Sequence, residues 1–187
     1  MNKIWKMLTA AIFCAALMIP GFSRADAALK LAVVPLIIGE NVEDDAGIKP
    51  IAYSSVVGEL FQYPDYDMVE AEPVRKAALA QQDHLFSKDG LTAVARATGA
   101  DVVIAMSVDT FDVTEDQMRR EPVTMLNFRG KFATINMLNG KYVEDHYRFR
   151  DEMESGAIHP KYDYPHQRFR YLCKRELNKA VKNNKIK

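Results

Sequence analysis

Cysteine is scarce in this chain, which excludes a fold held together by disulfide bonds. The 187 residues contain only two cysteines, Cys14 and Cys173. Cys14 lies in an N-terminal segment that we expect to be removed, so the mature chain keeps one thiol and has no internal partner for it. The remaining chain of roughly 160 residues is long enough to bury a core as a single domain, and its stability must come from packing.

An excess of charge is also missing, because 25 Lys and Arg residues balance 25 Asp and Glu residues. Without the N-terminal segment the chain keeps 22 basic and 24 acidic residues. A protein so close to neutrality does not attract a polyanion through its overall charge. We therefore expect no nucleic-acid partner.

The motifs of common enzyme chemistry are absent as well. The sequence has no Gly-x-Ser-x-Gly, no His-Glu-x-x-His, no Gly-x-Gly-x-x-Gly and no phosphate-binding loop. Ser54 and Ser55 suggest a nucleophile near the start of a helix, but serine in such a place more often bonds to the local backbone. The sequence therefore predicts no catalytic residue, no cofactor and no enzymatic activity.

The first 27 residues have the anatomy of a secretory signal peptide. Lys3 and Lys6 give a positive start, and residues 7–19 form a 13-residue apolar run. The small residues of the predicted cleavage site are Ala25, Ala27 and Ala28. We predict that residues 1–27 are removed and that the protein is exported to the periplasm, or secreted where no outer membrane exists.

Two alternatives keep the chain on a membrane. A spanning helix needs about 20 apolar residues, and the run at 7–19 is shorter. In the second alternative Cys14 is a lipoprotein cysteine that tethers the chain to a membrane. Bulky Phe13 argues against this, because it occupies the position where lipoprotein processing needs a small residue. We therefore expect a soluble mature chain.

The first half of the mature chain alternates between strand and helix patterns. Residues 29–38 form an apolar run typical of a buried strand. Because Pro35 cannot donate a ladder hydrogen bond, we expect the second half of this strand to lie at an edge or leave the sheet. A helix over 51–61 and a short strand over 66–71 follow. A helix that opens at Pro73 and another that Asp89 caps and Gly99 ends complete the series.

A second buried strand and a long hairpin come next. Residues 101–113 again form an apolar run, and the polar stretch at 112–120 is predicted to be a loop. Asn139-Gly140 then separates two alternating segments, 124–137 and 141–152, as a hairpin turn does. Gly130 interrupts the first of them and suggests a bulge. A connecting loop is predicted over 156–165.

The chain ends in a basic amphipathic helix. Its apolar stripe includes Cys173, which we predict to be buried, the alternative being a bond between chains. Between residues 168 and 187 there are eight basic side chains and one acid, Glu176. This excess is either a solvated face or a surface that contacts anionic lipid headgroups, phosphate-rich polymers or an acidic protein. The candidate surface consists of Arg168, Lys174, Arg175, Lys179 and Lys182.

The segment before this helix holds the densest group of metal-ligating residue types. His159, Asp163 and His166 offer two imidazoles and a carboxylate, a set that can bind zinc. Their spacing matches no established zinc motif, and a Tyr- and His-rich surface loop packed against the sheet is the preferred explanation. They are kept as weak candidates for a metal site.

These patterns together predict an α/β fold. We expect a mixed sheet of about five strands with packed helices, a C-terminal antiparallel hairpin and a final amphipathic helix, all within one domain over residues 28–187.

Three segments carry a resemblance to a known family. They are Leu31-Ala-Val-Val-Pro-Leu36, Ala97-Thr-Gly-Ala-Asp-Val-Val-Ile104 and the arms around Leu138-Asn-Gly-Lys141. They resemble the first strand, the central strand and the later hairpin of the small α/β domain shared by the CsgG curli-secretion lipoproteins and the amino-terminal domain of TolB. The chain departs from that pattern because it lacks a convincing lipoprotein cysteine and the long extra hairpins of a pore.

The resemblance implies a soluble accessory protein of the periplasm rather than a channel. Our leading hypothesis is a non-enzymatic envelope protein that acts through protein–protein contacts in assembly or transport. The alternative is a periplasmic module that binds a small ligand or a metal through the loops after Ile38 and Val113 and the His/Tyr segment.

Overall fold

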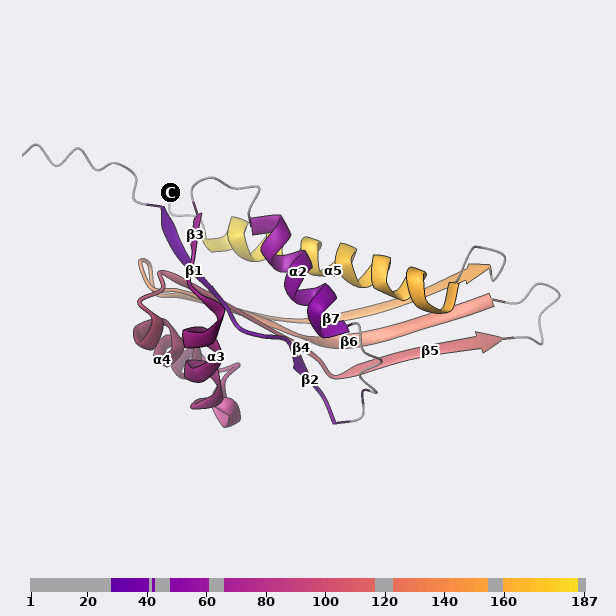
Figure 1. The fold of residues 1–187 in the computed structure, drawn as a ribbon, viewed down its shortest axis with the longest axis horizontal. Coiled ribbons are helices and arrows are strands. Elements are labelled where there is room, and N and C mark those ends of the chain that lie inside the picture. Colours follow the sequence, from indigo (N-terminus) through magenta and orange to yellow (C-terminus); the bar gives the residue numbers. More distant parts are fainter. Residues whose placement is uncertain are drawn as a thin grey trace, which may run out of the picture.

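A mixed sheet runs through the protein, with helices packed on both of its faces (Figure 1). The computed structural model describes residues 28–40, 42, 48–60, 66–116, 123–154 and 160–184. The strands are β1 (Leu29–Val33), β2 (Ile37–Ile38), β3 (Tyr66–Met68), β4 (Val102–Val108), β5 (Thr110–Asp116), β6 (Val123–Asn136) and β7 (Lys141–Glu154). The helices are α2 (Ile48–Leu60), α3 (Ala71–Leu79), the 3-10 turn η1 (Gln82–His84), α4 (Lys88–Thr98) and α5 (Pro160–Asn184). The predicted signal peptide, with Ala25 and Ala27 of its cleavage site, lies outside the described residues.

The α/β class and the mixed sheet are confirmed. Strands β3, β1 and β4 run parallel, β6 lies antiparallel to β4, and β7 lies antiparallel to β6 along its whole length. Strand β2 continues β1 along β4, and β5 continues β4 along β6. The seven strands therefore occupy five rows, which explains why the sequence suggested about five strands.

Each of the two interrupted rows contains one extra residue. Val33 lies opposite Ile104 and Ile37 opposite Ser107, so four steps along one strand match three along the other. Pro35 falls in this gap, where its missing N–H costs no ladder hydrogen bond. It breaks the strand as predicted, but the second half returns to the sheet as β2.

The second break separates β4 from β5 and corrects two predictions. Met106 lies opposite Phe132 and Thr110 opposite Arg129, which places a bulge at residues 107–109. The expected bulge in the first arm of the hairpin is thus in the neighbouring row, across from Gly130. The predicted loop at 112–120 is wrong over 112–116, because β6 supplies a full set of ladder partners for these polar residues.

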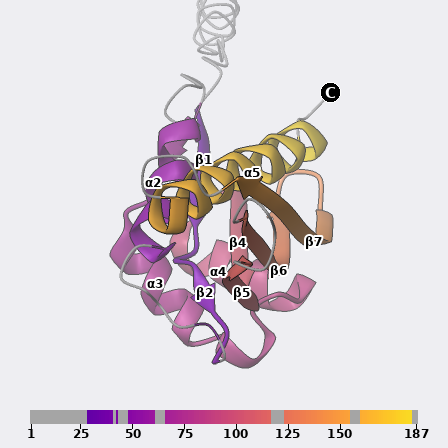
Figure 2. The same cartoon turned by 90° about the vertical axis from the view of Figure 1, so that its right-hand side faces the viewer.

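The two faces of the sheet pack against different helices. Val102, Ile104 and Met106 of β4 face the core beneath α2 and α5, whereas Val103 and Ala105 face the core beneath α3 and α4. Figure 2 shows these helix pairs on opposite sides of the strands. Every residue of β4 is buried, as the apolar run predicted.

Strands β5, β6 and β7 extend beyond α3 and α4 and form an arm, and among the described helices α5 is the one that runs along it (Figure 1). The hairpin turn at Gly140, whose φ is +68°, is confirmed. The alternation predicted for its second strand is confirmed as well, since Tyr147 is buried while Arg148 and Arg150 are exposed.

Each α-helix begins at another residue than predicted, and α2 begins at Ile48 instead of residue 51 and α3 at Ala71 instead of Pro73. Ser87, not Asp89, is the N-cap of α4, and its hydroxyl accepts a hydrogen bond from the Gly90 N–H. The predicted loop at 156–165 is wrong from residue 160 onward, because α5 begins at Pro160 and includes Pro165. Pro160 suits the first position of the helix, where its missing N–H costs nothing. Pro165 costs the helix a backbone hydrogen bond, and its burial in the core offsets this cost. Gly99 ends α4 in the left-handed conformation, as expected.

The hairpin approaches the bulge very closely at Gly130. The Tyr147 hydroxyl, from the residue opposite Gly130, donates a hydrogen bond to the Ser107 carbonyl. A Cβ atom on Gly130 would lie 1.9 Å from that carbonyl oxygen and 2.6 Å from the Tyr147 hydroxyl. Only glycine leaves room for both groups.

We predict that Gly130→Ala destabilises the protein by about 3 kcal/mol, because the new methyl group meets backbone that cannot move without breaking the bulge. The matched control is Gly58→Ala in α2, where an added Cβ meets nothing within 4 Å. It should be neutral or stabilising by up to about 1 kcal/mol. Urea unfolding of both variants measures the difference, and equal effects would contradict the role given to Gly130.

Candidate functional site

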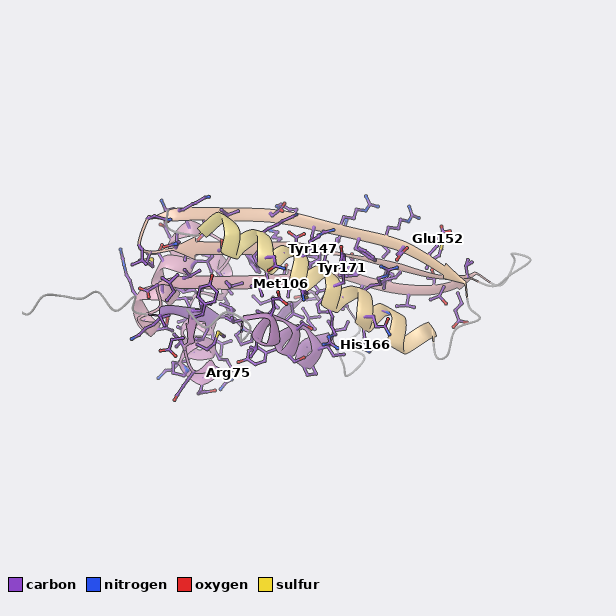
Figure 3. The ribbon with its side chains drawn as sticks, turned by 90° about the horizontal axis from the view of Figure 1, so that it is seen from above. Arg75, Met106, Tyr147, Glu152, His166 and Tyr171 are labelled. Atoms are coloured by element: carbon purple, nitrogen blue, oxygen red, sulfur yellow. The ribbon has the colours of Figure 1, made fainter. Side chains whose placement is uncertain are left out.

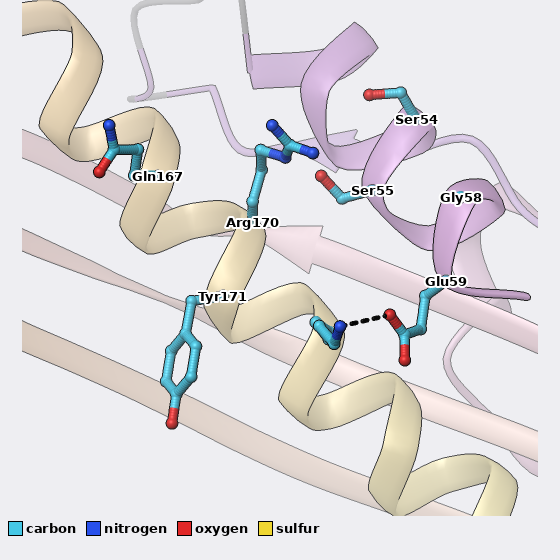
Figure 4. Close-up of a pocket in the computed structure, with 8 residues that line it drawn as sticks. Ser54, Ser55, Gly58, Glu59, Gln167, Arg170 and Tyr171 are labelled. Atoms are coloured by element: carbon cyan, nitrogen blue, oxygen red, sulfur yellow. Dashed lines mark ion pairs between the residues drawn. The ribbon is translucent and has the colours of Figure 1, made fainter. Parts of the chain in front are cut away.

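A polar groove lies between α2 and α5. It encloses about 400 Å³ and is lined by Ser54, Ser55, Gly58, Glu59, Gln167, Arg170, Tyr171 and Lys174 (Figure 4). A volume of this size falls within the range of small-molecule sites. The groove is therefore one place where the protein could hold a ligand.

The groove residues show no arrangement that activates a nucleophile. The hydroxyls of Ser54 and Ser55 both donate to the Ile51 carbonyl, at 3.0 and 2.6 Å. Their protons thus serve the helix backbone, as the sequence suggested. The Glu59 carboxylate is only 6% exposed and is paired with Lys174 at 3.0 Å, so its charge is already balanced.

Arg170 is the one groove cation without an acidic partner among the described residues. Figure 4 shows its guanidinium directed toward Ser55 on the facing helix. A guanidinium at the mouth of a polar groove can bind the oxygen atoms of a small anion in a bidentate manner.

The basic side chains of α5 mostly form ion pairs within the fold. The pairs are Arg168 with Asp151 at 3.0 Å, Lys174 with Glu59 at 3.0 Å, Arg175 with Glu176 at 2.8 Å and Lys179 with Glu176 at 3.1 Å. Lys179 also lies 3.6 Å from Asp145. The side chain of Lys182 lies outside the described residues. Much of the predicted interaction surface therefore fastens α5 to α2 and β7.

Glu176 has a role that the sequence reasoning missed. It is 2% exposed, on the inward side of α5, and accepts hydrogen bonds from Arg175 and Lys179. Two cations held at the rim of the core balance this buried carboxylate. Because Glu176 lies next to Leu177 in the apolar stripe of the helix, the sequence could have indicated that its side chain is buried.

Cys173 is buried, as predicted. Its Sγ lies 3.8 Å from Met106 Sδ beneath α5, and Figure 3 places Met106 below this helix. Burial raises the pKa of the Cys173 thiol far above its ordinary value, and the nearby Glu176 carboxylate adds to this rise. The group is therefore an inert part of the core.

The candidate metal ligands are only partly described. His159 and the side chain of Asp163 lie outside the described residues, and His166 lies partly buried on α5 (Figure 3). Where side chains are described, no three His, Cys, Asp or Glu residues come close enough to bind a metal ion together. The loop expected after Val113 is part of β5 and cannot serve as a binding loop there.

The face of the arm opposite α5 carries a second cluster of cations, which sequence reasoning did not single out as a site. It comprises Arg129, Lys131, Arg148 and Arg150, and we call it the open face. Arg129 lies directly opposite Arg148, and Arg150 is two residues along β7. A two-residue turn at Asn139-Gly140 would have paired Arg129 with Arg150, whereas the observed loop of residues 137–140 pairs Arg129 with Arg148, so the sequence could place these cations on one face but not give their register.

The helices in the described ranges include none with the length and apolarity needed to cross a lipid bilayer.

Comparisons with known proteins support the fold. No protein-family model matches the chain, and no curated protein matches it. A hypothetical protein of Chlamydia trachomatis, CT253, is 13% identical, with a TM-score of 0.51 over 84% of this chain and 95% of its own. The lipoprotein GNA1162 of Neisseria meningitidis is 15% identical over 82% of this chain and 99% of its own, with a TM-score of 0.45.

The C-terminal domain of LpoB from Salmonella enterica is 14% identical over 69% of this chain and 84% of its own, with a TM-score of 0.36. At such identities the likeness concerns the fold alone, and the Chlamydia structure carries it. The resemblance to CsgG and TolB stays a prediction.

The buried thiol predicts how stability depends on pH. In the unfolded chain Cys173 ionises near its ordinary pKa of 9.0, whereas the folded protein keeps its proton. The free energy of unfolding is therefore unaffected by ionisation of this thiol below pH 9. It falls as the pH rises above 9, with a slope of up to about 1.4 kcal/mol per pH unit, because the unfolded chain releases a proton that the folded protein keeps. Denaturant unfolding between pH 8 and 10 measures this slope. Cys173→Ala should flatten it, and parallel curves for the two proteins would contradict the assignment.

Proposed function

We propose that the protein is an exported, non-enzymatic envelope protein that acts by binding other proteins in periplasmic assembly or transport. The observation that carries this proposal is the arm of β5, β6 and β7. It projects beyond the α3 and α4 layer, and one of its faces bears exposed charged side chains that none of the described helices covers (Figure 1). Broad, flat surfaces of this kind suit a macromolecule better than a small substrate.

The state of the reactive side chains supports the same proposal. The groove serines bond to their own helix, the groove carboxylate pairs with Lys174, and the thiol is buried. These groups are used to build the fold and are poorly placed for chemistry on a substrate. The signal-peptide pattern of residues 1–27 supports export, and the resemblance of the sequence to CsgG and TolB supports an assembly role.

A module that binds a small anion is the second candidate function. Arg170 favours it, because its guanidinium faces the α2–α5 groove without an acidic partner in the described part of the chain. The groove is open and polar, so we expect weak binding with recognition mainly of charge.

Photo-crosslinking in living cells of the native species tests the leading proposal. We expect a photoreactive residue at Thr114 on the arm, or at Tyr171 on α5, to trap a discrete envelope protein. Tyr171 is 57% exposed and Thr114 is exposed on β5. The control position is Leu79 on α3, which is 58% exposed and should trap none. If neither test position trapped a protein while the purified chain retained a small molecule, the proposal would fail.

Titration calorimetry with inorganic phosphate tests the second candidate. Arg170→Ala is expected to weaken phosphate binding at least fivefold, because the guanidinium supplies the charge that the anion needs. Arg75→Ala serves as the control, since Arg75 lies on α3, away from the groove, and is paired with Glu72. Absence of phosphate binding to the unmodified protein at millimolar concentration would rule out this function.

A further inference from the structure

The cations of the open face are unusual because they lie together on two neighbouring strands and none of them forms an ion pair with a described residue. Arg129, Lys131, Arg148 and Arg150 have neither an ion pair nor a side-chain hydrogen bond to any described residue, whereas the described cations of the candidate surface on α5 are paired. Arg129, Arg148 and Arg150 are exposed and Lys131 is half-buried. The paired cations of the candidate surface thus lie on the helix that covers one face of the arm, and the unpaired cations lie on the opposite face.

This arrangement works against the stability of the free protein. Directly opposite residues of an antiparallel pair have Cβ atoms about 5 Å apart, and like charges there repel. Residues two apart on a strand are separated by about 7 Å. Arg129, Arg148 and Arg150 thus lie within roughly one Debye length, so their fields add at physiological salt. A binding partner of opposite charge would remove this repulsion.

The pattern around the cations distinguishes between kinds of partner. Along β7 the cations of the open face lie between Glu144 at one end and Glu152 at the other. Glu152 lies near the tip of the arm in Figure 3. Asp112, which accepts a hydrogen bond from Asn127, flanks them on β5. A uniformly anionic polymer or membrane would meet repulsion from these acids, whereas a protein surface can match a short basic patch with acidic borders.

Apolar anchoring to lipid also has no support on this face. The large apolar side chains exposed in the described part of the chain are Leu79 on α3, Leu138 in the hairpin turn and Tyr171 on α5. None of them belongs to the open face, so insertion into a bilayer would have to rely on charge alone.

We infer that the open face is the docking surface for an acidic patch on a partner protein, whose carboxylates pair with Arg129, Arg148 and Arg150. Arginine suits this role because its planar guanidinium can bind a carboxylate through two parallel hydrogen bonds. The inference rests on the proposed function and adds the chemistry of the partner and the surface that receives it.

Binding of a defined probe tests the inference on the full mature chain. The probe is a short, fluorescent peptide of alternating glutamate and serine, followed by anisotropy at low and physiological salt. We expect R129Q/R148Q/R150Q to bind the probe at least tenfold more weakly than the unmodified protein. The matched control, K76Q/K88Q/R96Q, removes the same charge from exposed positions on α3 and α4 and should bind normally.

A third variant, R129K/R148K/R150K, keeps the charge and should show an intermediate loss, because lysine cannot bind a carboxylate through a planar fork. The melting temperature of the glutamine variant should equal or exceed that of the unmodified protein, since repulsion is relieved. An equal loss in both glutamine variants would overturn the inference. Tighter arginine-dependent binding of polyphosphate or of anionic phosphatidylglycerol vesicles than of the peptide would also overturn it.

The cellular crosslinks separate this inference from the function on which it rests. If Tyr171 traps a protein and Thr114 does not, an interacting envelope protein remains but the open face is not its docking surface. If neither position traps a protein, the proposed function itself fails.

Discussion

The contact between Gly130 and the bulge at residues 107–109 governs the shape of the molecule. A bulge leaves backbone groups without ladder partners, and here neighbouring residues bond to two of them. The Tyr147 hydroxyl donates to the Ser107 carbonyl, and the Asp109 N–H donates to the Arg129 carbonyl. Ser107 Oγ accepts from the Lys131 N–H and donates to the Asp109 carboxylate. This network lets one row of the sheet continue from the buried body into the arm, so the position of the arm depends on the missing side chain at Gly130.

The arm that this contact permits has two faces of different electrostatic character. Toward α5, acids on β7 and α2 pair with the helix cations, so that face is neutral as well as packed. On the other side, arginines lie opposite one another without counter-ions among the described residues. The balanced composition of the whole chain conceals this difference. The local excess of basic residues over 168–187 pointed to α5 instead, where the described cations of the candidate surface are paired.

Local patterns predicted those parts of the fold that depend on neighbouring residues. The buried strand β4, the hairpin at Asn139-Gly140 and the end of α4 at Gly99 were all correct. The end of β5, residues 114–116, was missed because these residues are polar and are held in the sheet by pairing with β6. The candidate surface on α5 could be named from composition, but its ion pairs could not, since Glu59 and Asp151 come from distant segments. The groove likewise forms only when α2 and α5 pack together.

The burial of Cys173 connects the core to the proposed compartment. An exported protein meets oxidants and disulfide exchange, and an unpaired thiol reacts with them as the thiolate. Burial beneath α5 keeps Cys173 protonated and out of reach, so the final helix shields the thiol as well as covering the arm. That shield depends on the same ion pairs that neutralise the basic side chains of α5. The described cations of the candidate surface on α5 are thus explained by what they hold in place, whereas the open face presents a cluster of cations without ion pairs among the described residues.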